Sequence, residues 1–128
     1  MLSARLSKIL EKIPSCDILA DIGTDHGYIP LEAIKSNKCK KAIASDVSKG
    51  SLEKAINQVN LSNLNLVIDT RLGSGLKVLK EDETDVLIIA GMGGILIKEI
   101  LKDDYDKKFK KKTPTMIFQP VQFPENLR

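Results

Sequence analysis

Tryptophan is absent from this 128-residue chain, and aromatic residues make up only 4% of it. The core must therefore be aliphatic, and no row of aromatic residues stands out as a surface on which nucleic-acid bases could stack. A single histidine excludes a histidine-rich metal site, and we expect no metal ligand set. The two cysteines, Cys16 and Cys39, fit no metal-binding or redox spacing, which favours reduced structural thiols.

Long hydrophobic stretches are missing as well. No apolar run reaches the length of a secretory signal or a membrane span, so we expect a cytoplasmic protein with no membrane partner. Hydrophobic residues at 42% and charged residues at 29% are ordinary for a globular protein, which argues against disorder. The length suits one domain, residues 1–128. The formal net charge of +3 permits contact with nucleic acid without arguing for it.

Short apolar runs alternate with stretches of helical spacing along the chain. Because such alternation favours a parallel sheet, the predicted fold is α/β, a doubly wound parallel sheet. The run DVLIIA predicts a central strand covered on both faces. The mixed Lys and Asp segment 102–112 is interpreted as a solvated loop, with a strip that contacts RNA as the less favoured alternative. The predicted strands are 17–21, 42–46, 66–71, 85–90 and 115–119. The predicted helices are 2–13, 28–38, one that runs from the N-cap Ser48 to about residue 60, and one that follows Gly94.

The unusual residues of the chain come at the carboxyl ends of the predicted strands. They are Asp21–Gly27, Asp46, Gly73–Gly75, Gly91–Gly94 and Gln119–Pro120. These ends meet at one edge of a parallel sheet, where the ligands of such sheets bind. The glycines after the buried run would expose backbone to a ligand, and Met92 would form a flexible apolar wall against a purine. The sequence therefore predicts a single ligand site at this edge.

The stretch ILADIGTDHGYIP, residues 18–30, combines a strand, a glycine turn and the start of a helix. This arrangement brings backbone N–H groups and a helix N-terminus to a ligand. The carboxylates of Asp21 and Asp25 would repel a pyrophosphate and favour a ligand with a cationic centre. Asp46 comes about 20 residues after Gly27, the spacing at which a carboxylate meets ribose hydroxyls. S-adenosylmethionine, with a sulfonium, an ammonium and a ribose, has all the groups that these residues favour.

Several of these residues also have purely structural interpretations. Asp25 is equally suited to be the N-cap of the next helix, and Asp46 could cap the helix after that. His26 is more often a hydrogen-bonded scaffold residue than a catalytic base. Tyr28 suits either the ligand pocket or packing on the helix.

Several motifs of the chain carry a family resemblance. They are ADIGTDHGYIP (20–30), RLGSGL (71–76), IAGMGG (89–94), the pair Asp46-Val47 and the closing QP and LR. In these motifs the chain resembles bacterial tRNA (adenine-22-N1)-methyltransferases. The resemblance covers essentially the whole chain. It implies the Rossmann-like N-terminal domain of a class I methyltransferase, with S-adenosyl-L-methionine as cofactor and tRNA as substrate. It implies cofactor-binding roles for Asp21, Gly23, Asp25, His26, Gly27, Asp46, Val47, Gly73, Ser74, Gly91 and Met92, and catalytic roles for Asp25, Gly91 and Met92.

On this resemblance, Asp21 and Gly23 would contact the methionine end of the cofactor, and Gly73 and Ser74 its adenine. Asp25 and the Gly91–Gly94 loop would face the transferred methyl group and the target base. Asp25 replaces the middle glycine of the general methyltransferase turn, and Ser74 stands where an acid or amide is usual.

Compared with that family, we expect the chain to end after the fifth strand, without the last two strands and the helical tRNA-binding domain. We therefore expect cofactor binding but poor methylation of tRNA. The exposed fifth strand could associate with another copy of the chain. Three other functions stay open: a nicotinamide-dependent oxidoreductase, a non-catalytic binding module and a small-molecule methyltransferase.

Overall fold

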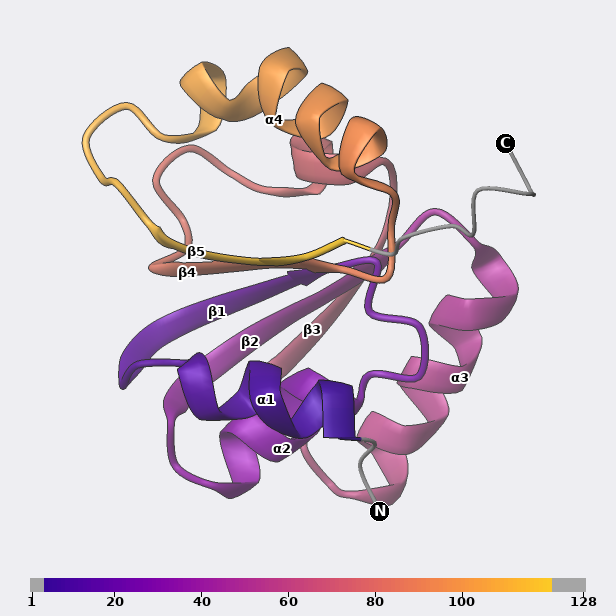
Figure 1. Cartoon of the computed structure of the whole chain (residues 1–128). Helices are drawn as coiled ribbons and strands as arrows, with labels where there is room; N and C mark the ends of the chain where they lie inside the picture. Colours follow the sequence, from indigo (N-terminus) through magenta and orange to yellow (C-terminus); the bar gives the residue numbers. More distant parts are fainter. Residues whose placement is uncertain (1–3, 121–128) are drawn as a thin grey trace.

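Five parallel strands in the order β3-β2-β1-β4-β5 form the centre of the computed structural model, which describes residues 4–120 (Figure 1). The strands are β1 (Cys16–Ile22), β2 (Cys39–Asp46), β3 (Ile68–Leu72), β4 (Val86–Ala90) and β5 (Thr115–Gln119). The helices are α1 (Ala4–Lys12), α2 (Tyr28–Lys35), α3 (Lys49–Leu61) and α4 (Gly94–Lys108), and η1 (Gly75–Val78) is a short 3-10 helix. No helix within residues 4–120 is long and apolar enough to cross a membrane.

The chain winds in two directions from the centre of the sheet. It first builds β1, β2 and β3 outwards, with α1, α2 and α3 on one face, and then returns to add β4 and β5 on the other side of β1 (Figure 1). η1 and α4 cover the opposite face. The predicted doubly wound parallel sheet is confirmed. Because the winding reverses between β1 and β4, their carboxyl ends border the position where such sheets bind ligands.

β4 joins the two layers of the core. Its side chains alternate between the faces of the sheet: Val86 and Ile88 pack in the layer of α1 and α2, and Leu87 and Ile89 pack in the layer of η1 and α4. All four are at most 1% exposed. The predicted central strand, covered on both faces, is therefore confirmed.

α4 is longer than predicted. It continues to Lys108, so the interpretation of residues 102–112 as a loop is wrong for its first part. The prediction failed because of Asp104, a charged residue that lies on the buried side of the helix two turns after Ile97. Its carboxylate accepts a hydrogen bond from Lys77 Nζ at 2.9 Å. A charged residue on the inner side of the helix hid the apolar pattern.

Other boundaries differ by a few residues. α2 ends at Lys35, before Lys38, because Asn37 adopts a positive φ of 59°, a conformation that ends helices. β1 and β2 begin before their predicted starts, and their first residues, Cys16 and Cys39, are register partners with free thiols. β3 spans Ile68–Leu72 instead of 66–71.

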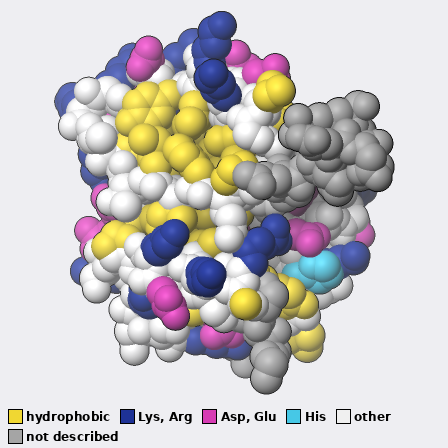
Figure 2. Space-filling view, in the orientation of Figure 1, with side chains coloured by type: hydrophobic (Ala, Val, Ile, Leu, Met, Phe, Trp, Pro, Cys, Tyr) yellow, Lys and Arg dark blue, Asp and Glu magenta, His cyan; other side chains and the backbone are white. Residues whose placement is uncertain are grey.

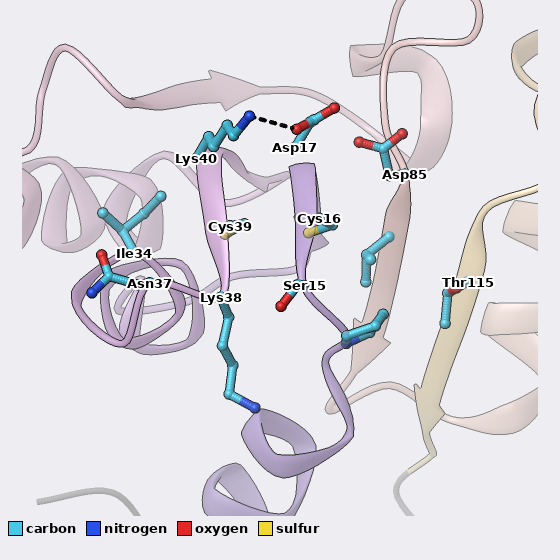
Figure 3. A pocket seen from close by; sticks show the side chains of 12 residues that line it. Ser15, Cys16, Asp17, Ile34, Asn37, Lys38, Cys39, Lys40, Asp85 and Thr115 are labelled. Carbon is cyan, nitrogen blue, oxygen red and sulfur yellow. Dashed lines mark ion pairs between the residues drawn. The ribbon is translucent and has the colours of Figure 1, made fainter.

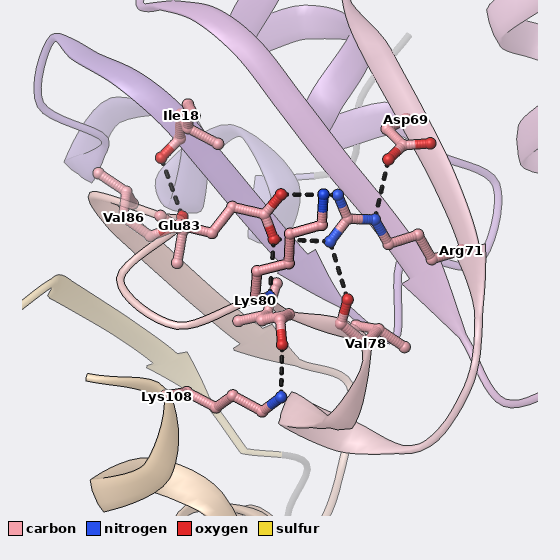
Figure 4. A network of polar contacts seen from close by, with 10 residues as sticks. Ile18, Asp69, Arg71, Val78, Lys80, Glu83, Val86 and Lys108 are labelled. Atoms are coloured by element: carbon pink, nitrogen blue, oxygen red, sulfur yellow. Dashed lines mark hydrogen bonds and ion pairs between the residues drawn. The ribbon is translucent and has the colours of Figure 1, made fainter. Parts of the chain in front are cut away.

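Arg71, at the end of β3, holds the segment between β3 and β4 (Figure 4). Its guanidinium donates two hydrogen bonds of 2.7 Å to the two carboxylate oxygens of Glu83. It also donates to the Val78 carbonyl at 2.8 Å and to Asp69 at 2.9 Å. The guanidinium of Arg71 lowers the pKa of Glu83. This network fixes the loop that follows β3, from which the Gly73 N–H donates to the Asp46 carbonyl at 3.0 Å.

Hydrophobic side chains are exposed near β5, the last strand of the described sheet. Met116 is 40% and Phe118 is 39% exposed. Figure 2 shows hydrophobic side chains gathered over the region of α4 and β5. Within residues 4–120, no strand pairs with the outer edge of β5. Association of two copies through this edge stays a prediction, which sedimentation velocity over a range of concentrations tests.

Candidate functional site

A broad groove of about 950 Å³ lies at the amino ends of the strands (Figure 3). Within it, Lys40 and Asp17 form an ion pair of 3.3 Å whose side chains are 82% and 72% exposed, so water screens it. Burial raises the pKa of the Cys39 thiol to about 12 and also raises the pKa of Cys16, which leaves both thiols protonated and unreactive. Parallel α/β folds bind their ligands at the carboxyl ends of the strands, and this amino-end groove lies at the opposite ends.

A second cavity, of about 440 Å³, lies at the carboxyl ends of β1, β2 and β4. We call it the carboxyl-end cavity. Seven of the predicted site residues line it: Asp21, Gly23, Asp25, His26, Asp46, Gly91 and Met92. The other described residues that line it are Arg5, Leu6, Thr24, Tyr28, Ile29, Ser51 and Ala90. The carboxyl ends of these three strands therefore border one cavity, whereas Gly27, Val47, Gly73 and Ser74 do not line it. That this cavity binds a ligand stays a prediction.

The turn after β1 passes close to the loop after β4. Gly23 has φ of 78°, and its N–H and that of Thr24 donate to the Ser45 carbonyl at 2.9 and 2.8 Å. A Cβ at Gly23 would lie 2.5 Å from Met92 Cε. The backbone conformation favours glycine at this position, and its bare Cα lets the end of the Met92 side chain pack directly against the turn.

Two backbone donors orient the Asp46 carboxylate. The Asp25 N–H donates to Oδ2 at 3.0 Å, and the Ser48 N–H donates to Oδ1 at 2.9 Å. Each oxygen retains a second lone pair that can accept from a ligand hydroxyl. The α3 N-cap is Ser48, as predicted, and its Oγ accepts from the Ser51 N–H at 3.2 Å. The N-cap interpretation of Asp25 is wrong, because the N-cap of α2 is Gly27.

Asp21 places a buried carboxyl group beside this carboxylate. Its side chain is on β1 and the residue is only 4% exposed. Burial raises the pKa of Asp21 to about 7, the nearby Thr24 hydroxyl partly offsets the rise, and the charge of Asp46 adds to it. Because Asp21, Asp25 and Asp46 line one cavity, a ligand with positive charge and hydroxyl groups suits it best.

The loop after β4 offers bare backbone to the cavity. Gly91 has φ of 74°, and a Cβ there would meet no atom within 4 Å. Its N–H donates to the Gln119 carbonyl at 3.2 Å, which ties the loop to β5. Met92 follows as a half-buried side chain against Gly23. The loop can therefore approach a ligand closely with an apolar side chain and with carbonyl groups.

Two features of the cavity were missed by sequence reasoning. The rings of His26 and Tyr28 stack, with centroids 5.3 Å apart and planes 9° apart, and His26 Nδ1 lies 3.1 Å from Asp25 Oδ2. Arg5 of α1 also lines the cavity. No local pattern indicates that the first helix reaches the carboxyl ends of the strands. Two aromatic residues separated by one glycine give no signal of stacking either.

The predicted residues outside the cavity have other surroundings. A Cβ at Gly27 would lie 3.2 Å from the Cβ of Ala55, so this glycine lets the start of α2 approach α3. Val47 is 68% exposed, and Ser74 is exposed at the start of η1. Gly73 reaches the site only through its hydrogen bond to the Asp46 backbone.

Comparisons with known proteins agree with this geometry. The family model described as "Methyltransferase domain" matches residues 2–128. A tRNA (adenine(22)-N(1))-methyltransferase of Bacillus subtilis is 44% identical over 119 residues, which are 93% of this chain and 49% of that protein. The chain thus spans about half the length of this relative.

Two solved structures extend the likeness. The B. subtilis m1A22 tRNA methyltransferase TrmK has a TM-score of 0.88 at 43% identity, over 94% of this chain and 50% of that one. TrmK of M. capricolum, in complex with S-adenosyl-homocysteine, has a TM-score of 0.84 at 35% identity, over 99% of this chain and 55% of that one.

Proposed function

The chain belongs to the methyltransferase domain family, and we propose that its carboxyl-end cavity binds S-adenosyl-L-methionine for transfer of a methyl group to N1 of adenine 22 in tRNA. One observation carries the proposal: three carboxylates and two glycines with positive φ gather around a single cavity at the strand ends. The relative with TM-score 0.84 was solved with S-adenosyl-homocysteine, the product of methyl transfer from this cofactor. The identity of 44% to a tRNA (adenine(22)-N(1))-methyltransferase supports the substrate.

The residues that line the cavity fit this cofactor. Asp46 has free lone pairs for the ribose hydroxyls, and Asp21 would attract the ammonium group. Arg5 is the one Lys or Arg among the described residues that line the cavity, and it would meet the carboxylate of the methionine part. Gly23 permits close approach of the backbone. When bound, the cofactor supplies a methyl group on a sulfonium, which is electrophilic.

The remaining predicted residues complete the proposed site. Gly73 and Ser74 would lie beside the cofactor's adenine, with Val47 at the strand end near them. His26 and Gly27 would contribute through the turn between β1 and α2.

The proposed catalytic work is mainly positioning. Adenine N1 has an in-plane lone pair and needs no strong base, and correct alignment of two reactants can supply on the order of 7–11 kcal/mol. The adenine becomes cationic as the methyl group arrives. The Asp25 carboxylate or the carbonyl groups at Gly91 would stabilise that charge by accepting from the exocyclic amine. Met92 would exclude water as an apolar wall.

Calorimetry with S-adenosyl-L-methionine, S-adenosyl-homocysteine and NAD tests the cofactor. We expect heat from the first two and none from NAD, because the acids would repel a pyrophosphate. Asp46→Asn should weaken S-adenosyl-L-methionine binding by about 10-fold or more, since hydrogen bonds to a charged group are worth about 1.5–3 kcal/mol. Asp17→Asn makes the same substitution in the amino-end groove and should bind like the wild type. Binding of NAD in preference would favour an oxidoreductase and contradict the proposal.

A single-turnover assay tests the substrate. The chain in excess over tRNA is incubated with methyl-labelled cofactor, and the tRNA carries either adenine or guanine at position 22. Label at N1 of adenine, and only in the first tRNA, is the expected result, although we expect slow transfer. Equal labelling of both tRNAs would contradict adenine 22 as the target.

A further inference from the structure

His26 and Tyr28 form a stacked aromatic pair in the carboxyl-end cavity. Their planes are 9° apart and both side chains line the cavity. Tyr28 is 40% exposed and the His26 side chain is 36% exposed. Neither ring belongs to either hydrophobic layer of the core. Core packing therefore does not account for the pair.

The local backbone builds the pair. Gly27 stands between the two residues with φ of 77°, and Tyr28 is the first residue of α2. Side chains two residues apart do not face each other in a regular helix, so the left-handed glycine is what lets the rings meet. Asp25 fixes the arrangement from the other side, because its Oδ2 lies 3.1 Å from His26 Nδ1. The Asp25 N–H in turn donates to Asp46.

We propose that the stacked His26–Tyr28 pair is the surface on which the target purine base stacks during methyl transfer. The proposal rests on the proposed function and names the part of the cavity that takes the substrate base. A purine has a flat π face that stacks on aromatic rings, and enzymes that modify a base first take it out of its own stack. Because the rings are already parallel and held by Asp25, the base finds an ordered platform.

The charge of the cavity favours recognition through the base and not through phosphate. Asp21, Asp25 and Asp46 line the same cavity and would repel a phosphate group. Stacking carries no net charge, so it tolerates these acids. The ligand class is therefore an unpaired purine of a single-stranded or opened RNA segment.

A fluorescence titration tests the platform. The probe is a five-nucleotide RNA with 2-aminopurine at its centre, whose fluorescence falls when the base stacks. The 128-residue chain is first saturated with S-adenosyl-homocysteine to occupy the proposed cofactor site. Wild type and Tyr28→Phe, which keeps the ring, should both quench the probe. Tyr28→Leu should lose the quenching and weaken binding about 5- to 150-fold, the range expected for one base stacked on an aromatic side chain.

His26→Leu is the second variant, and it should also weaken quenching. Both Tyr28 variants should bind S-adenosyl-homocysteine within about twofold of the wild type, and the urea unfolding of all three variants is measured in parallel. Quenching by Tyr28→Leu and His26→Leu equal to the wild type would overturn the proposal. So would a loss of S-adenosyl-homocysteine affinity in Tyr28→Leu equal to its loss of probe affinity, because the Tyr28 ring would then contact the cofactor. Failure of the wild type to bind S-adenosyl-homocysteine would instead contradict the proposed function, and the probe titration would still test the platform.

Discussion

Asp21→Asn should change how the stability of the protein depends on pH. Burial raises the pKa of Asp21 to about 7 in the folded chain, whereas an unfolded aspartate has a pKa of about 3.9. Between these values the folded chain holds a proton that the unfolded chain has released. Raising the pH through this window therefore lowers the free energy of unfolding. Above the folded pKa no further change comes from this group.

The size of the effect follows from the two pKa values. From pH 5 to pH 8, Asp21 alone should lower the free energy of unfolding by roughly 2.5 kcal/mol. The asparagine side chain of the variant has no proton to lose, so the difference between variant and wild type should grow by that amount. Urea unfolding at several pH values measures it, as a relative shift of the midpoint of about 1 M.

Asp106→Asn is the matched control, because it removes an exposed carboxylate on α4. We expect its stability to run parallel to that of the wild type over the same pH range. If the stability of Asp21→Asn also runs parallel to that of the wild type, the Asp21 carboxyl is not desolvated, which would contradict the structure. Saturating S-adenosyl-L-methionine should flatten the wild-type dependence, since a bound cation favours the ionised form of Asp21.

Other substitutions test separate parts of the site. Gly23→Ala should cost about 1–2 kcal/mol of stability, measured by urea unfolding, because its φ of 78° is unfavourable for alanine. Adding Met92→Ala should relieve the contact at Met92 Cε but not this conformational cost. Full recovery of stability in the double variant would contradict the argument. Arg5→Gln should weaken S-adenosyl-L-methionine binding about 10-fold in calorimetry, since charged hydrogen bonds are worth about 1.5–3 kcal/mol. Lys8→Gln on the same helix, outside the cavity, should not. Glu83→Gln should lower the free energy of unfolding by about 2 kcal/mol, since it weakens a pair whose side chains are 16% and 20% exposed; an unchanged urea midpoint would contradict this.

The strands of the sheet were predictable from the sequence because the apolar pattern of each strand lies within its own residues. The run Val86–Ala90 is apolar at every position, and a strand covered on both faces has no other pattern. The gathering of Asp21, Asp46 and Gly91 was predictable for a related reason: parallel topology brings carboxyl ends together. Asp104 shows the limit, since its burial depends on a lysine of η1 that no helical pattern includes.

Contacts between distant elements could not be predicted. Arg5 lines the cavity because α1 packs across α2, a fact of tertiary structure that the spacing of α1 does not contain. The neighbouring positions of Cys16 and Cys39 follow from the register of β1 on β2. The raised pKa of Asp21 depends on its burial, which is a property of the folded chain.

Asp25 connects the two halves of the proposed site. Its φ of 54° is a conformation that aspartate tolerates better than most residues, and it aims the N–H at Asp46. Its carboxylate meanwhile lies against His26. A glycine at this position would keep the backbone donor to Asp46 and lose the carboxylate together with its contact to the ring. Asp25→Gly should therefore lose less affinity for S-adenosyl-L-methionine than Asp46→Asn does, while the 2-aminopurine RNA is quenched less. An equal loss in both titrations would show that the Asp25 side chain acts on the cofactor and not on the aromatic pair.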